Sequence, residues 1–259
     1  MDLQLNGKRA LVTGSTAGIG FAIAELLASE GAHVIINGRT GKRVEEAVKK
    51  LNRPVAGLAA DLGTPEGARE AIRLFPDVDI LVNNVGIYEA KPFAAITDDD
   101  WQHLFEVNVM SGVRLSRHYL PRMLERNWGR IVFISSESAL QIPAEMIHYG
   151  MTKTAQLAIA RGMAETTAGT GVTVNSVLPG PTASEAVGGF IEGVARQQGV
   201  TAQQIQREFF EKVRPTSLLK RFATPEEVAV MVAFVCSPLA SATNGAALRT
   251  DGGVVRAIV

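Results

Sequence analysis

The sequence KRALVTGSTAGIGFAIAELLASEG, from Lys8 to Gly31, decides the fold expected for this chain. Its start is a short apolar run typical of a buried strand, and its second half carries apolar residues with helical period. Gly14, Gly18 and Gly20 lie between them in a G-x-x-x-G-x-G turn. Glycines let the backbone approach a pyrophosphate, and the free N–H groups of a helix start favour negative charge. The stretch predicts a phosphate-binding turn, although glycine-rich turns also occur for packing reasons alone.

The alternation of short apolar strands and helices continues along the chain. Further strands are expected within residues 32–38, 54–60, 79–86, 130–135 and 171–182, with a last strand near the C-terminus. This order predicts an α/β fold, a Rossmann-like doubly wound parallel sheet of about seven strands flanked by helices. Because single α/β domains reach 259 residues, we expect one dinucleotide-binding and catalytic domain over residues 1–259.

Charge and composition limit the kinds of binding partner expected for this chain. The chain has 26 basic and 26 acidic residues, so it exerts no long-range attraction on nucleic acid or an anionic membrane. We therefore expect a small-molecule substrate, no nucleic acid and no membrane. The N-terminus has no apolar core of signal-peptide length and no apolar span is long enough for a membrane, so we expect a cytoplasmic protein. One cysteine and four scattered histidines predict no metal site.

The second strand ends at Gly38 without the acidic residue that binds the ribose hydroxyls of NAD. Arg39, Lys42 and Arg43 follow instead, and such a basic group accommodates a 2′-phosphate. This favours NADP(H), with NAD(H) possible. The alternative is a solvated run of charges that opens the next helix.

Tyr149 and Lys153 are four residues apart on an expected helix, so their side chains share one face. A nearby cation favours a phenolate, so Lys153, helped by an oxidised nicotinamide, should lower the pKa of Tyr149 toward the working range. Ser136 follows the buried strand RIVFIS, and strand ends are where open α/β sheets bind ligands. Ser136 could hold a substrate oxygen while Tyr149 exchanges its proton. A Tyr-x-x-x-Lys pair alone, however, is more often a surface contact.

Two helical segments are relevant to the site. Residues 98–126 predict a long helix that Pro121 should bend, and Asn108 in its middle is either a satisfied core amide or part of the active site. Residues 184–215 predict a helical insert that acts as a substrate lid.

The chain resembles the short-chain dehydrogenase/reductase superfamily, of the single-domain type similar to 3-oxoacyl-[acyl-carrier-protein] reductases. The resemblance covers almost the whole length and rests on the following motifs: Thr13-Gly14-x-x-x-Gly18-Ile19-Gly20, Asp61, Asn83-Asn84-Val85-Gly86, Asn108, Ser136, Tyr149-x-x-x-Lys153, Pro179-Gly180 and Asp251-Gly252-Gly253.

The resemblance implies a role for each catalytic position. Ser136 orients the substrate oxygen, Tyr149 is the acid/base, Lys153 lowers its pKa and binds the nicotinamide ribose, and Asn108 holds a water linked to Lys153. It also implies that Asp61 lies at the adenine, Asn83 near the adenosine ribose and Arg39 at the NADP phosphate. The expected cofactor-binding set is Gly14, Ser15, Thr16, Gly18, Ile19, Gly20, Arg39, Asp61, Leu62, Asn83, Gly86, Tyr149, Lys153, Pro179, Gly180, Thr182 and Ser184.

The sequence departs from the family pattern at three positions. Val85 replaces the usual alanine after the two asparagines, and Ala17 stands where many NADP-binding members have a second basic residue. Ser184 stands where a threonine commonly contacts the nicotinamide amide, with Thr182 as another candidate.

The predicted function is an NADP(H)-dependent oxidoreductase that interconverts a ketone or aldehyde and the corresponding alcohol. The alternatives are an NAD-dependent dehydrogenase of a sugar, steroid or secondary alcohol, and a non-catalytic dinucleotide-binding sensor. A 3-oxoacyl thioester is a possible substrate. The resemblance also suggests a homotetramer, or a homodimer, built on the helices at 98–126 and 149–168.

Two sets of side chains point to opposite kinds of substrate. An apolar pocket wall would come from Phe190, Ile191, Phe209 and Phe210, which could equally be lid packing or subunit contacts. A polar substrate would be favoured by Glu137, Glu145 and His148.

Overall fold

The computed structural model describes residues 2–51 and 53–258. In this part of the chain a seven-stranded parallel sheet has the order β3-β2-β1-β4-β5-β6-β7, which confirms the predicted doubly wound fold. Its strands are β1 (Arg9–Val12), β2 (His33–Gly38), β3 (Ala56–Ala59), β4 (Ile80–Asn83), β5 (Gly129–Ile134), β6 (Val172–Pro179) and β7 (Ala247–Thr250).

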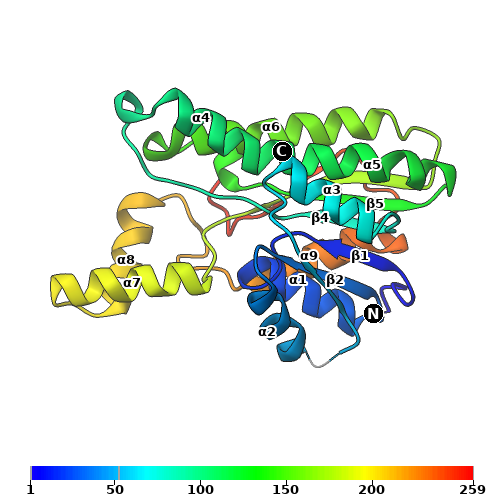
Figure 1. Cartoon of the computed structure of the whole chain (residues 1–259). Helices are drawn as coiled ribbons and strands as arrows, with labels where there is room; N and C mark the ends of the chain where they lie inside the picture. The colour runs from blue at the N-terminus through cyan, green and yellow to red at the C-terminus, as the bar shows by residue number, and fades with distance from the viewer. Residues whose placement is uncertain (1, 52, 259) are drawn as a thin grey trace.

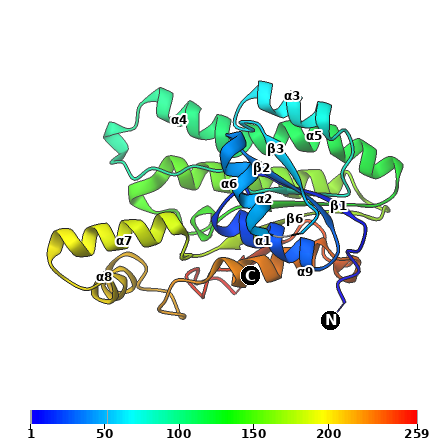
Figure 2. The same ribbon diagram turned by 60° about the horizontal axis from the view of Figure 1, so that its bottom comes forward.

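Helices cover both faces of the sheet (Figures 1 and 2). One face carries α1 (Gly18–Ser29), α2 (Gly41–Leu51) and α9 (Pro225–Cys236). The other carries α3 (Pro65–Leu74), α4 (Asp98–Phe105), α5 (Ser111–Glu125) and α6 (Ile147–Glu165). Each side encloses its own apolar core, and β5 is buried along its whole length. Strands buried on both faces read as continuous apolar runs, which is why the sequence located them.

The predicted helix at 98–126 contains an irregular turn that the sequence did not indicate. Between α4 and α5 lies η2, a π-helical turn over Glu106–Met110. Asn108 is in this turn, whereas α5 continues unbroken through Pro121. π-turns occur frequently at functional sites because the extra residue interrupts the regular hydrogen-bond ladder.

The insert at 184–215 is helical, as predicted. It contains α7 (Glu185–Gln198), α8 (Ala202–Glu208) and the π-helical η5 (Phe209–Val213). In both views α7 and α8, in yellow and orange-yellow, extend to one side of the sheet (Figures 1 and 2). Ser184 caps α7 by accepting a hydrogen bond from the Val187 N–H.

Side chains tie the ends of the central strands together. Asn84 donates from Nδ2 to the carbonyls of Thr13 and Gly14, and its own N–H donates to Thr13 Oγ1 at 2.8 Å. On the other side of β1, Asn37 Oδ1 accepts from the Gly14 N–H at 2.9 Å. The glycine turn is therefore fixed between β2 and β4, at the point where the strand order reverses. Ligands of open α/β sheets bind at such a point.

None of the helices within residues 2–51 and 53–258 is long and apolar enough to cross a membrane. Cys236 is fully buried in α9, as its apolar surroundings in the sequence indicate.

Candidate active site

A cavity of about 230 Å³ lies at the carboxyl ends of β4, β5 and β6. Several of the residues predicted from the sequence line it together: Ile19, Gly86, Ser136, Tyr149, Lys153, Pro179, Gly180, Thr182 and Ser184. The cavity also has walls outside the predicted site residues: Asn84, Ile87, Tyr88, Ile134, Ser135 and Val187. Asn84 belongs to the family motif, and the others lie at or after strand ends or at the start of α7.

Lys153 is held by two acceptors. Its Nζ donates to the carbonyl of Ile134 at 2.9 Å and to Gln156 Oε1 at 3.3 Å. The side chain is 4% exposed, and burial lowers the pKa of Lys153 to about 8 because desolvation disfavours the ammonium. A Cβ at Gly86 would lie 3.4 Å from Nζ and 3.5 Å from Asn108 Oδ1, so glycine leaves room for both groups.

The predicted lowering of the Tyr149 pKa is wrong for the protein by itself. Burial raises the pKa of the phenol strongly; a hydrogen bond with Ser136 opposes this, while Glu137 and Tyr88 add to it. Lys153 Nζ is 5.6 Å from the centre of the Tyr149 ring, and two of its hydrogens are used elsewhere. Desolvation of the phenolate is the largest cause of the raised pKa of Tyr149.

Ser136 lies at the end of β5 and is restrained by its neighbour. Its hydroxyl donates to Glu137 Oε2 at 2.5 Å and accepts from the Ser138 N–H at 3.1 Å. Glu137 is itself buried, and its other oxygen accepts from Arg214 Nε at 2.9 Å. Arg214, at the end of η5, also lies 3.5 Å from Glu145. The helical insert is thus joined by a buried ion pair to the residue beside Ser136.

Asn108 has every polar group of its side chain engaged. Nδ2 donates to the Ile87 carbonyl and to Thr152 Oγ1, and Oδ1 accepts from the Ile87 N–H at 2.7 Å. Its backbone carbonyl accepts from Gln156 Nε2 at 2.6 Å. The sequence left open whether Asn108 is a core amide or an active-site residue. The structure shows an amide whose side chain is fully hydrogen-bonded beside Lys153, with Gln156 on its backbone carbonyl.

The remaining predicted residues lie outside the cavity lining. Gly14, Arg39 and Asp61 follow the neighbouring strands β1, β2 and β3, so they lie along the same edge of the sheet. Arg39 is exposed. Thr16 is next to Gly38, because a Cβ there would lie 2.5 Å from Thr16 Cγ2. Asp61 Oδ1 accepts from the Gly63 N–H.

Three of the predicted cofactor-binding side chains point into the fold. Ser15 is fully buried and its hydroxyl donates to the Val12 carbonyl at 2.7 Å. Leu62 belongs to the apolar core. Asn83 is 4% exposed and donates to Ser116 on α5. These residues could approach a cofactor only through their backbone, whereas Asn84 has its side chain at the edge of the sheet.

The glycines of the turn fit a close backbone approach. Gly14 and Gly18 have φ of +60° and +56°, a region that favours glycine. A Cβ at Gly20 would lie 2.5 Å from Asn84 Nδ2. No side chain caps the start of α1, so the first N–H groups of the helix are available to a ligand. The residues at this turn therefore fit the phosphates of a dinucleotide.

Some apolar residues of the insert pack against other side chains, and others line the cavity. Phe209 and Phe210 pack edge-on against each other, and both pack against Phe222, with ring centres 5.0 to 5.1 Å apart. Neither ring lines the cavity. Ile191 is half-buried, and the side chain of Phe190 lies outside the described residues. Of the insert, Ser184 and Val187 reach the cavity.

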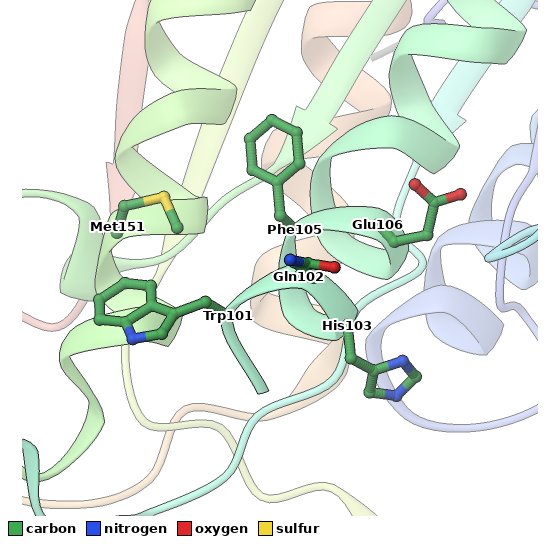
Figure 3. A pocket seen from close by; sticks show the side chains of 6 residues that line it. All are labelled: Trp101, Gln102, His103, Phe105, Glu106 and Met151. Carbon is green, nitrogen blue, oxygen red and sulfur yellow. The ribbon is translucent and has the colours of Figure 1, made fainter. Parts of the chain in front are cut away.

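A second hollow, of about 690 Å³, is lined by the side chains shown in Figure 3. Its walls are Trp101, Gln102, His103 and Phe105 from α4, Glu106 from η2 and Met151 from α6. It contains none of the residues predicted to be catalytic. Elsewhere in the described ranges, too, no three His, Cys, Asp or Glu side chains gather closely enough to hold a metal.

Comparison with known proteins identifies the family. The family model described as short chain dehydrogenase matches residues 8–194. The chain is 50% identical to the uncharacterized oxidoreductase YvaG of Bacillus subtilis over the full length of both. It is 36% identical to 3-oxoacyl-[acyl-carrier-protein] reductase FabG of Aquifex aeolicus, covering 98% of this chain and 100% of the relative. L-sorbose reductase of Gluconobacter frateurii, solved with NADPH and L-sorbose, superposes with a TM-score of 0.93 at 32% identity, over 100% of both chains.

The chain belongs to the short-chain dehydrogenase/reductase family. It is therefore an oxidoreductase acting on CH–OH or C=O groups, of a family that binds NAD(P).

The ion pair beside Ser136 gives a test of stability. We expect Arg214→Met to lower the free energy of unfolding by about 3–5 kcal/mol, because it leaves the Glu137 carboxylate buried without a partner. Denaturant unfolding measures this. Arg214→Lys should lose less, and adding Glu137→Gln to Arg214→Met should recover part of the loss. If Arg214→Met is as stable as the wild type, the pair does not hold the insert in place.

Burial of Lys153 gives a test of pH dependence. The change from 10.5 to about 8 corresponds to about 3 kcal/mol, and lost hydrogen bonds offset about 1. We therefore expect Lys153→Met to be about 2 kcal/mol more stable than the wild type near pH 7. Between the two pKa values the unfolded chain binds more protons than the folded one, so wild-type stability rises with pH and the difference shrinks. Urea unfolding at about pH 7 and about pH 10 measures both values; a pH-independent difference would contradict this expectation.

Proposed function

We propose that this protein is an NADP(H)-dependent oxidoreductase that reduces a ketone or aldehyde, or oxidises the corresponding alcohol, with Tyr149 as general acid and base. The observation that carries the proposal is the cavity itself. Ser136 follows β5, Tyr149 and Lys153 lie on α6, and the three side chains line one space at the carboxyl edge of the sheet. A sensor would need the fold but not this set of proton-exchanging groups.

The residues divide the work of the reaction. When bound, the nicotinamide supplies or accepts a hydride. In reduction, the Ser136 and Tyr149 hydroxyls polarise the carbonyl oxygen and Tyr149 donates its proton to it. The raised pKa of Tyr149 keeps the phenol protonated, as an acid must be, and Lys153 favours the phenolate that remains after transfer. In oxidation the same proton moves from the alcohol to Tyr149.

The hydroxyl of Ser136 must turn for this role. Its hydrogen points to Glu137, and a carbonyl oxygen needs that hydrogen as a donor. Arg214 draws the Glu137 carboxylate from the other side, which weakens its hold on Ser136 relative to an unpaired carboxylate. We propose that the insert at 184–215 acts as a lid that couples to Ser136 through this pair.

The preference for NADP(H) rests on Arg39. It follows Gly38 at the end of β2 and is exposed, beside the glycine turn. Residues at this point contact the 2′-position of the adenosine ribose in dinucleotide folds. The similarity to an L-sorbose reductase solved with NADPH supports the same choice. NAD(H) remains the alternative cofactor.

The substrate panel follows from the relatives. A 3-oxoacyl thioester is supported by the FabG relative, and a sugar ketone by the L-sorbose reductase structure. We further propose a cytoplasmic homotetramer, or a homodimer, built on α4–α5 and α6. In support, the hollow of about 690 Å³ between those helices contains Phe105, which is 39% exposed, and Met151.

The first test is turnover. With NADPH and a panel of a 3-oxoacyl thioester analogue, sugar ketones and simple ketones, we expect Tyr149→Phe to lower kcat by at least about 100-fold, because the proton donor is lost. Cofactor binding, followed by NADPH fluorescence, should be retained. Turnover that survives in Tyr149→Phe would refute the acid/base assignment, and silence of the wild type with carbonyls and alcohols would favour the sensor.

The second test is cofactor preference. We expect Arg39→Ala to lower kcat/KM for NADPH by about 10- to 100-fold, the value of a lost charge-assisted hydrogen bond, with little change for NADH. Steady-state kinetics with both cofactors measure the ratio. Lys42→Ala, on the same basic run, is the matched control and should change the ratio less. An equal loss with both cofactors would contradict a phosphate contact at Arg39.

A further inference from the structure

A single amide joins the lysine of the active site to the π-turn. Lys153 Nζ donates to Gln156 Oε1 at 3.3 Å, and Gln156 Nε2 donates to the Asn108 carbonyl at 2.6 Å. Gln156 and Asn108 are each 1% exposed and Lys153 4%. No proton-exchanging role is available to an amide, so the bridge acts through the position of the groups it connects.

The orientation of the amide is fixed by its surroundings. A backbone carbonyl can only accept a hydrogen bond, so the NH₂ group of Gln156 must face Asn108. The oxygen of the same amide must then face Lys153. Because Gln156 lies three residues after Lys153 on α6, the two side chains share one face of the helix. The π-turn at Asn108 brings the third partner into place.

The bridge also determines which hydrogens of Lys153 remain. An ammonium has three N–H donors. Ile134 and Gln156 take two of them, which leaves the third for the cavity that Lys153 lines with Tyr149. Without Gln156, the ammonium would lose one of these two acceptors inside a buried site.

We propose that Gln156 is a positioning residue for Lys153: it ties the ammonium to the Asn108 carbonyl, keeps it charged at neutral pH and directs its remaining hydrogen into the cavity. The consequence for activity rests on the proposed function. The effect of Gln156 on the ionisation of Lys153 does not rest on it.

Other ionisable groups near the site affect Tyr149 or pack against other helices. Glu137 on η3 (Glu137–Ala139), Tyr88 after β4 and Arg214 at the end of η5 act on the Tyr149 phenol. His148, on α6, packs edge-on against Trp101 on α4 at 5.8 Å. For Lys153 the cause of the lowered pKa is burial. The hydrogen bond that Gln156 accepts therefore favours the charged form of the Lys153 ammonium.

The experiment is a titration of Lys153 by NMR in protein labelled at lysine ¹³Cε, with Lys153→Arg used to identify the resonance. We expect Gln156→Met, which has a similar shape but no such acceptor, to lower the pKa of Lys153 by about one pH unit, the effect of one neutral hydrogen bond. Gln156→Glu keeps an acceptor and should leave the value unchanged or raise it. Thr154→Val is the control, because Thr154 is the next residue on α6 and donates to the Ala139 carbonyl.

The possible outcomes distinguish the proposal about Gln156 from the proposed enzymatic function. An unchanged Lys153 titration in Gln156→Met, or an equal fall in Thr154→Val, would overturn the proposal. If Gln156→Met does not fold, Gln156→Glu decides: a lowered value overturns the proposal and an equal or higher one supports it. In an active enzyme, the alkaline limb of kcat/KM for reduction should move to lower pH in Gln156→Met, in parallel with the titration. A wild type without turnover would refute the proposed function and leave the NMR result standing.

Discussion

The arrangement depends on the hydrogen bonds that join the ends of β1, β2 and β4. Thr13 Oγ1 accepts from two successive backbone N–H groups, those of Asn84 and Val85, and Asn84 returns two bonds to the chain after β1. Asn37 fixes the other side through Gly14. Buried backbone N–H and C=O groups must be paired. Where the chain leaves the sheet, these side chains supply the hydrogen bonds that the strands no longer provide. The crevice they hold open is where the glycine turn and Gly86 meet.

Tyr149 and Lys153, the proposed catalytic pair, are held in a site that is unfavourable to their charged forms. Burial lowers the pKa of Lys153 and raises that of Tyr149, so each is driven toward its neutral form. A neutral phenol suits the proposed role of Tyr149 as proton donor. The positive charge of Lys153, however, then depends on its hydrogen-bond acceptors. Ile134 and Gln156 provide them, and Gln156 connects in turn to Asn108. In the described part of the chain, the hydrogen bonds of the Lys153 ammonium therefore go to neutral groups.

The only charge pair buried close to Ser136 in the described part of the chain has a different role. Glu137 and Arg214 are 77 positions apart, yet they join the catalytic strand to the end of the helical insert. Breaking a buried pair is costly because it leaves one charge unpartnered. The pair thus restrains the insert and, through the carboxylate, the hydroxyl of Ser136.

The sequence by itself determined what is local. The strand, glycine turn and helix at Lys8–Gly31 and the i, i+4 placement of Tyr149 and Lys153 follow from hydrophobic period and backbone freedom. Family resemblance added the expected roles of Ser136 and Asn108. The strand, turn, helix and i, i+4 spacing depend on neighbours along the chain, so the sequence contains them in full.

The tertiary structure decided what depends on burial and on partners distant in sequence. It turned the side chains of Ser15, Leu62 and Asn83 into the fold, reversed the expected direction of the Tyr149 pKa, and placed Gln156 against Asn108. Desolvation and long-range hydrogen bonds arise only once helices have packed on the sheet. No pattern along the chain showed these contacts between residues distant in sequence.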